Sequence, residues 1–343
     1  MTATTRLPPG PWAAPVVQAL RAGALVARAD TAVIELSGAG AVSCVQGLLT
    51  NDIEKPGDGA FVYGALLTPK GMMVVDGWAG RRDTAVRFTT STAGRESALD
   101  IFTRTVPPRL ARSADRTADC AVLRLAGAHA LAIAEAARLP APAAPGRVIA
   151  VTIDAVPGEV ARAGEHAPFV LQVTVPPAAI GRLASRLVTA GAVAVETPAL
   201  ELARILAGWP KLGSEVDAHT LPQEVRLDAV GGVSYTKGCY TGQETVSRLH
   251  FRGHTNRELV GLEFDAEPGP MDPMPALAED REAGRVSSVA WLPDGGTLAS
   301  PSGRWIGLAV LRREYGPGTR VRAGGVSARV VALPFPLPRW DPA

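Results

Sequence analysis

Residues 237–244 of this chain read Lys237-Gly238-Cys239-Tyr240-Thr241-Gly242-Gln243-Glu244, and Arg248 follows four positions later. Thr241 and Glu244 have the three-residue spacing of a capping box, which predicts a helix that begins at or next to Thr241. Cys239 then lies just before a helix N-terminus, where unpaired N–H groups and a partial positive charge stabilise thiolates and attract anions. We therefore expect a reactive thiol with a lowered pKa beside an anion site.

The other residues of the run allow two interpretations. Lys237 adds a full positive charge, and Gly238 and Gly242 permit backbone angles and close approaches that suit a loop around a ligand. Alternatively, Cys239 is a small buried hydrophobe and the glycines only shape a turn. The residues by themselves leave both interpretations open.

The run resembles the signature of the YgfZ-type folate-binding proteins, which act in iron–sulfur cluster assembly or repair and are relatives of aminomethyltransferase, the glycine-cleavage T-protein. Further segments are similar to segments of that family and follow in the same order: Gln46-Gly47-Leu48-Leu49-Thr50-Asn51-Asp52, Leu66-Leu67-Thr68-Pro69-Lys70-Gly71, and the run from Ala203 to Pro210 with Gly213 and Pro222-Gln223-Glu224 downstream. The eight-residue signature is specific, whereas each of the other segments is weak alone. The matches end at Arg248, and the last quarter of the chain agrees only in general character.

The resemblance implies an α+β fold of the aminomethyltransferase type, with a central folate pocket and a small C-terminal β-barrel. Short strand-like runs divided by Gly- and Pro-rich turns after residue 258 are typical of such a barrel or of a sandwich. We expect four parts: 1–115, the N-terminal part of the folate-binding region; 116–195, a central α+β domain; 196–257, the signature region that closes the folate pocket; and 258–343, the barrel.

Local patterns predict several elements. Two apolar runs, Phe61 to Leu67 and Met72 to Trp78, flank Pro69-Lys70-Gly71 and predict a β-hairpin. A helix is predicted from Thr197, because Pro198 suits its first position and Gly208 suits its end.

The resemblance also implies roles for individual residues. Cys239 is expected to be the functional thiol. Asp76 lies where T-proteins carry an acidic pair that engages folate and supports one-carbon transfer, but the adjacent residue here is Val75, and this argues against aminomethyltransferase activity. Asn51 and Asp52 are expected either to line the folate pocket or to form a turn. The remaining signature residues are expected to orient the thiol or to shape the pocket: Lys237, Gly238, Tyr240, Gly242, Gln243, Glu244 and Arg248.

Folate suits this set of residues. Its pterin ring needs a mostly apolar slot with a few fixed polar groups, and its glutamate tail needs cationic or N–H partners. Asp76 can accept hydrogen bonds from the pterin, and Lys237, Arg248 or the signature helix can meet the tail.

Three functions follow from this ligand. The first is a tetrahydrofolate-binding accessory protein that supports iron–sulfur cluster assembly or repair, with client or assembly proteins as partners. The second is a tetrahydrofolate-dependent aminomethyl transferase. The third is a folate-binding module in which Cys239 is only structural.

Composition sets further expectations. The chain has 343 residues, of which 47% are hydrophobic and 20% charged, and this is enough to bury a large core. The net charge is only +2 and the basic residues are scattered, so we expect no nucleic-acid partner. No run reaches the ~18 to 20 apolar residues that span a membrane. The three cysteines are remote from one another and no signal peptide is evident, so we expect a reducing, cytoplasmic location.

Other chemistries have weaker support in the sequence. His250 and His254 are spaced like two metal ligands on one helical face, but no third ligand accompanies them, and we expect no metal site. A cysteine hydrolase needs a histidine partner for Cys239, and no known hydrolase pattern is present. Three cysteines are too few for a cluster bound wholly by one chain, which leaves open a cluster shared with a partner.

Overall fold

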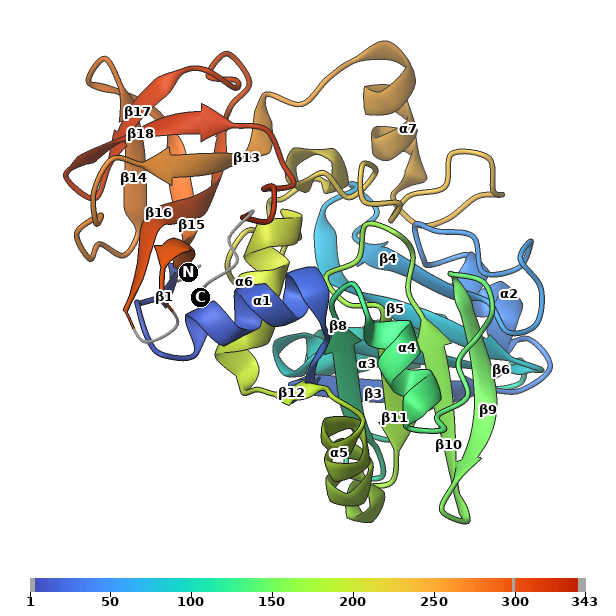
Figure 1. The fold of residues 1–343 in the computed structure, drawn as a ribbon. Helices are drawn as coiled ribbons and strands as arrows, with labels where there is room; N and C mark the ends of the chain where they lie inside the picture. Colours follow the sequence, from blue (N-terminus) through green and yellow to red (C-terminus); the bar gives the residue numbers. More distant parts are fainter. Residues whose placement is uncertain (1–3, 298–299, 339–343) are drawn as a thin grey trace.

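The computed structural model describes residues 4–297 and 300–338, and three β-sheets organise this part of the chain. Figure 1 shows a barrel on one side, two further sheets on the other side, and the helices α1 and α6 between them. The bounds of these helices are Ala13–Ala22 for α1 and Thr197–Ala207 for α6. The predicted α+β class with a C-terminal barrel is therefore confirmed.

The first sheet is antiparallel and has the strand order β4-β5-β6-β3-β7. Two helices, α2 and α3, pack on it, and the buried apolar side chains between them form one cluster. The elements are β3 Thr31–Ser37, α2 Ala41–Gln46, β4 Phe61–Leu67, β5 Met73–Arg82, β6 Ala85–Ser91, η1 Thr92–Gly94, α3 Arg95–Thr105 and β7 Arg112–Asp115.

The predicted hairpin is confirmed as β4 and β5. Gly71 has a φ of 85°, which favours glycine at the turn. The register pairs Tyr63 with Trp78 and Ala65 with Asp76. Because alternate residues of a strand point to the same face, the side chains of Tyr63, Asp76 and Trp78 lie on one face of the sheet.

The second sheet has the order β12-β2-β8-β11-β10-β9. Helices α4 and α5 supply apolar side chains to its core; in α5 these include Leu183 and Leu187, four residues apart on one helical face. The elements are β2 Leu25–Arg28, β8 Ala121–Ala126, α4 Ala130–Ala136, β9 Arg147–Ile153, β10 Val156–Arg162, β11 Leu171–Val175, η2 Pro177–Ala179, α5 Ile180–Thr189 and β12 Val193–Ala194.

The third sheet closes into the barrel, because β15 pairs with both β14 and β16. Its strands are β13 Arg257–Phe264, β14 Met274–Ala278, β15 Arg281–Gly296, β16 Pro301–Arg312, β17 Arg320–Ala323 and β18 Val326–Val331. Strand β14 contains Pro275, and a proline weakens the sequence signal of a strand.

The N-terminal residues contribute to all three sheets. Strand β1, Thr5–Leu7, pairs in parallel with Ser288–Ala290 of β15, whereas β2 pairs with β8 and β3 with β6. The range 1–115 therefore contains strands of three sheets. Local patterns cannot reveal this, because long-range pairing decides which sheet a strand joins.

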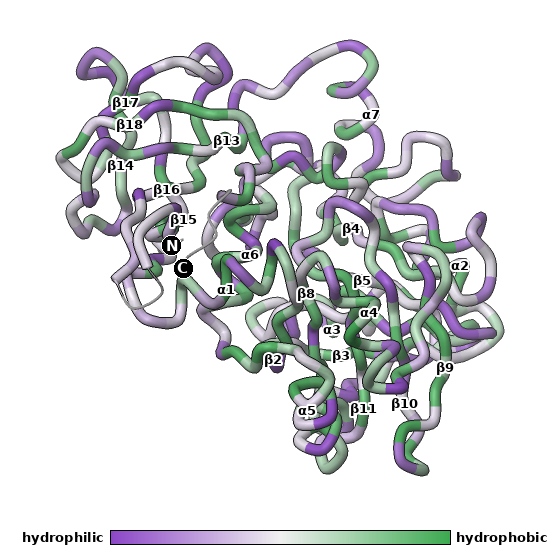
Figure 2. The backbone as a smooth tube through the Cα atoms, viewed as in Figure 1, coloured by the Kyte–Doolittle hydropathy of each residue, from purple (hydrophilic) through white to green (hydrophobic). Residues whose placement is uncertain are grey.

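The largest apolar cluster lies where the three sheets meet α1 and α6. Figure 2 shows apolar stretches inside the sheets and polar stretches in the peripheral loops. As predicted, α6 carries Pro198 in its first turn and ends at Gly208, whose φ is 65°. The chain then continues through η3, Pro222–Val225, to α7, Gln243–Arg252.

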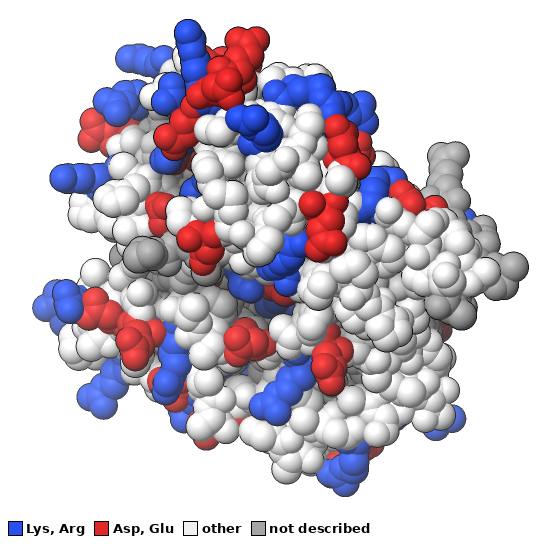
Figure 3. Space-filling model, turned by 90° about the vertical axis from the view of Figure 1, so that its left-hand side faces the viewer, with Lys and Arg blue, Asp and Glu red and all other residues white. Residues whose placement is uncertain are grey.

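The surface carries both signs of charge. On the face in Figure 3, basic and acidic side chains are interspersed. Within residues 4–297 and 300–338, no helix combines the length and apolar character needed to cross a membrane.

Candidate functional site

A cavity of about 170 Å³ lies where strands of the first sheet meet β8 and the segment after α6. Aromatic side chains form part of its walls, and polar and charged side chains form much of the rest. The lining residues that matter most for chemistry are Tyr63, Asp76, Trp78, Arg124, Phe169, Glu201, Arg204, Trp209 and Lys211.

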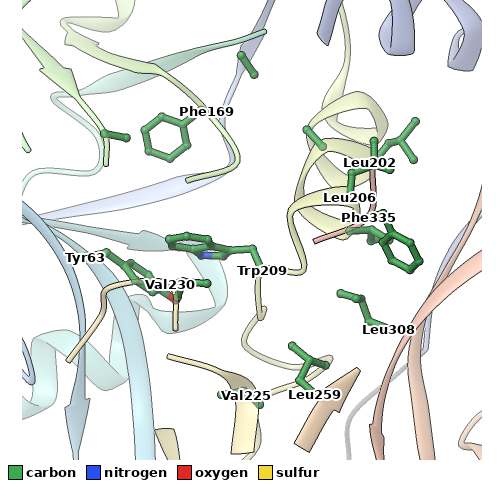
Figure 4. Close-up of a cluster of buried hydrophobic side chains, with 14 of the residues drawn as sticks. Tyr63, Phe169, Leu202, Leu206, Trp209, Val225, Val230, Leu259, Leu308 and Phe335 are labelled. Carbon is green, nitrogen blue, oxygen red and sulfur yellow. The ribbon is translucent and has the colours of Figure 1, made fainter. Parts of the chain in front are cut away.

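Four aromatic side chains build the walls. The ring centroids of Tyr63 and Trp209 are 4.4 Å apart, and the ring of Trp78 stacks on that of Trp209 at 5.8 Å and contacts Phe169 at 5.0 Å. Figure 4 shows Trp209 between Tyr63 and Phe169 on one side and Leu206 and Phe335 on the other. The aromatic side of the cavity is therefore a continuation of the protein core.

Asp76 is a carboxylate that lies beside the aromatic walls. The Tyr63 hydroxyl donates a hydrogen bond of 2.8 Å to Asp76 Oδ2, and the Thr90 hydroxyl donates to the Asp76 carbonyl at 2.7 Å. Burial raises the pKa of Asp76, and the Tyr63 hydrogen bond and the charge of Arg124 oppose the shift only in part. The Tyr63 hydrogen bond thus orients the carboxylate, and burial shields it from water.

Arg124 supplies positive charge to the same cavity. Its guanidinium lies 4.3 Å over the ring of Phe169, and its Nε and Nη2 donate to Gln172 Oε1 at 3.2 and 3.1 Å. Burial lowers the pKa of Arg124 to about 10, although the charge of Asp76 favours its protonated form. At neutral pH it remains a cation and partly offsets the charge of Asp76.

A second charged group forms the other edge of the cavity. Glu201 accepts from Arg204 Nε and Lys211 Nζ, both at 3.1 Å. Arg204 is buried and also binds Glu215 at 2.9 Å and Ser288 at 2.8 Å, so it joins α6 to the barrel. Lys211 is more exposed, with 37% of its side-chain surface accessible, and is the more available cation.

The residues present fit the ring of a folate. A flat bicyclic ring suits the aromatic walls, and Asp76 can accept its N–H groups. Pockets for drug-sized ligands usually measure about 300 to 1,000 Å³, so this cavity matches the ring rather than the whole of tetrahydrofolate. The glutamate tail has to lie outside it.

Cys239 does not line this cavity, and its residue is exposed. The predicted capping box is wrong: α7 begins at Gln243, its N-cap is Gly242 with a φ of 81°, and no side chain caps it. A Cβ on Gly242 would lie 2.6 Å from the Thr68 carbonyl oxygen, so this segment packs tightly on the turn of the β4–β5 hairpin. Asp76 lies five residues further along than Gly71, about 16 Å in an extended strand.

Lys237 and Tyr240 are buried beside the thiol segment. The Lys237 ammonium donates to the carbonyls of Gln46, Leu49 and Asn51, and lies 5.0 Å from the centre of the Tyr240 ring. Burial raises the pKa of Tyr240. Lys237 is therefore committed to backbone carbonyls and does not line the cavity.

Asn51 and Asp52 serve as turn residues. Asn51 Nδ2 donates to the carbonyls of Tyr63 and Gly231, both at 2.7 Å. Asp52 Oδ1 accepts from the backbone N–H groups of Glu54 and Lys55. Neither residue lines the cavity. Of the two expectations for Asn51 and Asp52, their contacts are those of turn residues.

The other signature residues lie at the surface or at the start of α7. Gly238, Glu244 and Arg248 are exposed, and the Gln243 N–H donates to the Tyr240 carbonyl at 3.1 Å. None of them lines the cavity. Of the predicted site residues, only Asp76 does.

Sequence reasoning missed the aromatic walls, Arg124 and Lys211. One signal was available, since the hairpin centred on Pro69-Lys70-Gly71 places Tyr63 opposite Trp78 and beside Asp76. Phe169 and Trp209 come from distant segments, and only tertiary packing brings them to the cavity.

The chain is similar in sequence to known proteins. The GCVT N-terminal domain matches residues 16–234. An aminomethyltransferase of Rubrobacter xylanophilus is 30% identical over 312 residues, which cover 88% of this chain and 80% of that protein. The tRNA-modifying protein YgfZ of Vibrio vulnificus YJ016 is 36% identical over 143 residues, about two fifths of each chain.

A solved structure shows the same fold. It is the glycine cleavage system aminomethyltransferase T from Bartonella henselae, with a TM-score of 0.75 and 17% identity over 98% of this chain and 92% of that one. At this identity the likeness concerns the fold alone. The domain match and the Rubrobacter relative go further: this chain belongs to the aminomethyltransferase (GCVT) family.

Proposed function

We propose that this protein binds tetrahydrofolate, with the pterin ring in the Asp76 cavity, and uses Cys239 to support the assembly or repair of iron–sulfur clusters. The observation that carries the folate part is the Asp76 carboxylate, which Tyr63 orients beside the aromatic walls of the cavity. Membership of a family with folate-related proteins supports the same ligand.

Each cavity residue has a defined task in this proposal. Tyr63 fixes the Asp76 carboxylate so that it accepts N–H groups of the ring, and Trp78 and Trp209, whose rings stack on each other, form an apolar wall beside the ring. Lys211, at the cavity edge, is placed to meet the carboxylates of the tail. Tetrahydrofolate, when bound, supplies a carrier of one-carbon units.

Cys239 suits contact with another protein better than chemistry on the bound ring. Its residue is exposed, whereas Cys44 and Cys120 are half-buried and burial raises the pKa of both. An accessible thiol can meet a metal cluster or a thiol of a partner. We propose iron–sulfur client or assembly proteins as these partners and the cytoplasm as the compartment, because the cysteines are unpaired.

The alternative is a tetrahydrofolate-dependent aminomethyl transferase. The Rubrobacter relative favours it, since the similarity extends over 88% of this chain. The cavity argues against it, because Val75 is fully buried in the core of the first sheet and leaves Asp76 without a second acid beside it. Transfer of a one-carbon unit to tetrahydrofolate by the purified protein would favour this alternative.

Calorimetric titration of the reduced protein with tetrahydrofolate tests the proposal. We expect saturable binding that weakens about tenfold or more in Asp76→Ala, because hydrogen bonds to a charged group contribute about 1.5–3 kcal/mol. Asp100→Ala is the matched control, since Asp100 is exposed on α3 and forms an ion pair with Arg104, away from the cavity. Failure of the wild-type protein to bind would remove folate from both candidate functions.

A further inference from the structure

Lys237 is a buried lysine whose ammonium donates hydrogen bonds to three backbone carbonyls. Its ammonium donates to Gln46 at 2.5 Å, Leu49 at 2.6 Å and Asn51 at 3.0 Å. An ammonium has three N–H bonds, and each one is used. Only 8% of the residue is accessible.

The three acceptors belong to one short segment, residues 46–51, which runs from the end of α2 toward β4. Two backbone hydrogen bonds join the same segment to the signature loop: the Thr241 N–H donates to Gly47 and the Ser234 N–H donates to Thr50, both at 3.0 Å. Cys239 lies between these two ties. These two hydrogen bonds therefore hold the loop on both sides of the thiol. The Lys237 ammonium adds charged hydrogen bonds between them.

We propose that Lys237 is a positioning residue that ties the Cys239 loop to residues 46–51 and thereby fixes where the thiol is presented. The effect on function rests on the proposed role of Cys239. The contact between Lys237 and residues 46–51 does not depend on that role. Lys237 acts through the backbone and touches neither the Asp76 cavity nor its contents.

The energetics make this lysine hard to replace. Removing the ammonium leaves three carbonyl oxygens without their donor, and an unsatisfied buried group costs about 1–3 kcal/mol. Burial lowers the pKa of Lys237 to about 8, while the charges of Asp52 and Glu54 favour the ammonium. At neutral pH the ammonium form, which has the third donor, therefore prevails.

Amide hydrogen exchange of Lys237→Met, which keeps the side-chain length but loses the donors, tests the tie. We expect the Thr241 and Ser234 amides to exchange at least tenfold faster than in the wild type. Lys237→Arg, which keeps the charge and donors, should recover part of the protection. Lys55→Met is the control, because Lys55 is an exposed lysine close in sequence to the same segment.

A folded Lys237→Met protein whose Thr241 amide exchanges at the wild-type rate would overturn the proposal. If Lys237→Met does not fold, Lys237→Gln, which retains an amide donor, is measured against the same criterion. Two readouts separate this inference from the proposed function. Tetrahydrofolate should bind Lys237→Met within about twofold of wild type, and Cys239-dependent activity in cells should fall in Lys237→Met and return in Lys237→Arg.

If Cys239→Ser has no effect in cells, the proposed function fails, but the exchange rates still decide whether Lys237 ties the loop. If the exchange rates are unchanged while Cys239→Ser is inactive, the positioning role fails and the proposed function stands.

Discussion

The Asp76 cavity lies along the strands of the β4–β5 hairpin and the Cys239 segment packs on its turn, and the two regions are built differently. The cavity continues the largest apolar cluster, and its walls are core residues such as Tyr63 and Trp209. The loop is exposed at Gly238 and Cys239 and is held by Lys237 and by the tight contact of Gly242 with the hairpin turn.

This difference predicts how each region responds to mutation. In the cavity, binding and stability depend on the same side chains, so substitutions there should change both. At the thiol, the side chain contributes little to the core, so a substitution should remove function while stability stays the same. The following variants are chosen to break or refine this distinction.

The largest effect on function is expected for Cys239→Ser. In cells that lack their own copy of the gene, we expect iron–sulfur enzyme activity to be at least tenfold lower with this variant than with the wild type. The free energy of unfolding should change by less than about 0.5 kcal/mol, because the residue is exposed. Cys44→Ser is the control. Normal enzyme activity with Cys239→Ser would assign the cysteine a structural role at most.

Trp209→Leu should affect both properties of the cavity. Trp209 is 5% exposed and contacts Tyr63 and Trp78, so its loss leaves a void in the core and opens the slot. We expect a loss of about 2–4 kcal/mol in unfolding free energy, measured by urea denaturation, together with weaker tetrahydrofolate binding. Weaker binding without any loss of stability would contradict the claim that the cavity walls are also part of the stabilising core.

The sequence predicted the architecture better than the site. The hairpin, α6 and the barrel follow from local patterns and from the family resemblance. The cavity does not, because Arg124 lies on β8, Phe169 precedes β11 and Trp209 follows α6, and nothing local relates these positions. The sequence placed Cys239 before a helix correctly, but it could not show that Lys237 points to residues 46–51 rather than to a ligand.

Asp76→Asn should raise stability while it lowers binding. Because burial raises the pKa of Asp76, its ionised form is disfavoured in the folded protein, and its stabilising contribution is lost as pH rises through that pKa. At pH 7 the neutral amide avoids this cost, and we expect a gain on the order of 1 kcal/mol in unfolding free energy. The gain should shrink as pH falls below that pKa and vanish below the ordinary pKa of aspartate, where the carboxyl is neutral in both the folded and the unfolded protein. Equal destabilisation at every pH would contradict this account.

The smallest effect is expected for Tyr63→Phe, which removes the hydroxyl and leaves the aromatic wall in place. Loss of one hydrogen bond to Asp76 should weaken tetrahydrofolate binding about fivefold at pH 7, or about 1 kcal/mol. The same hydrogen bond lowers the pKa of Asp76, so without it the pKa rises further. Binding needs the ionised carboxylate, and its loss on acidification should therefore begin at a higher pH in Tyr63→Phe than in the wild type. Titrations across pH measure this shift, with Tyr315→Phe in the barrel as the control. A pH profile that does not move would mean that Tyr63 acts only as a wall, and that Asp76 is oriented by other groups.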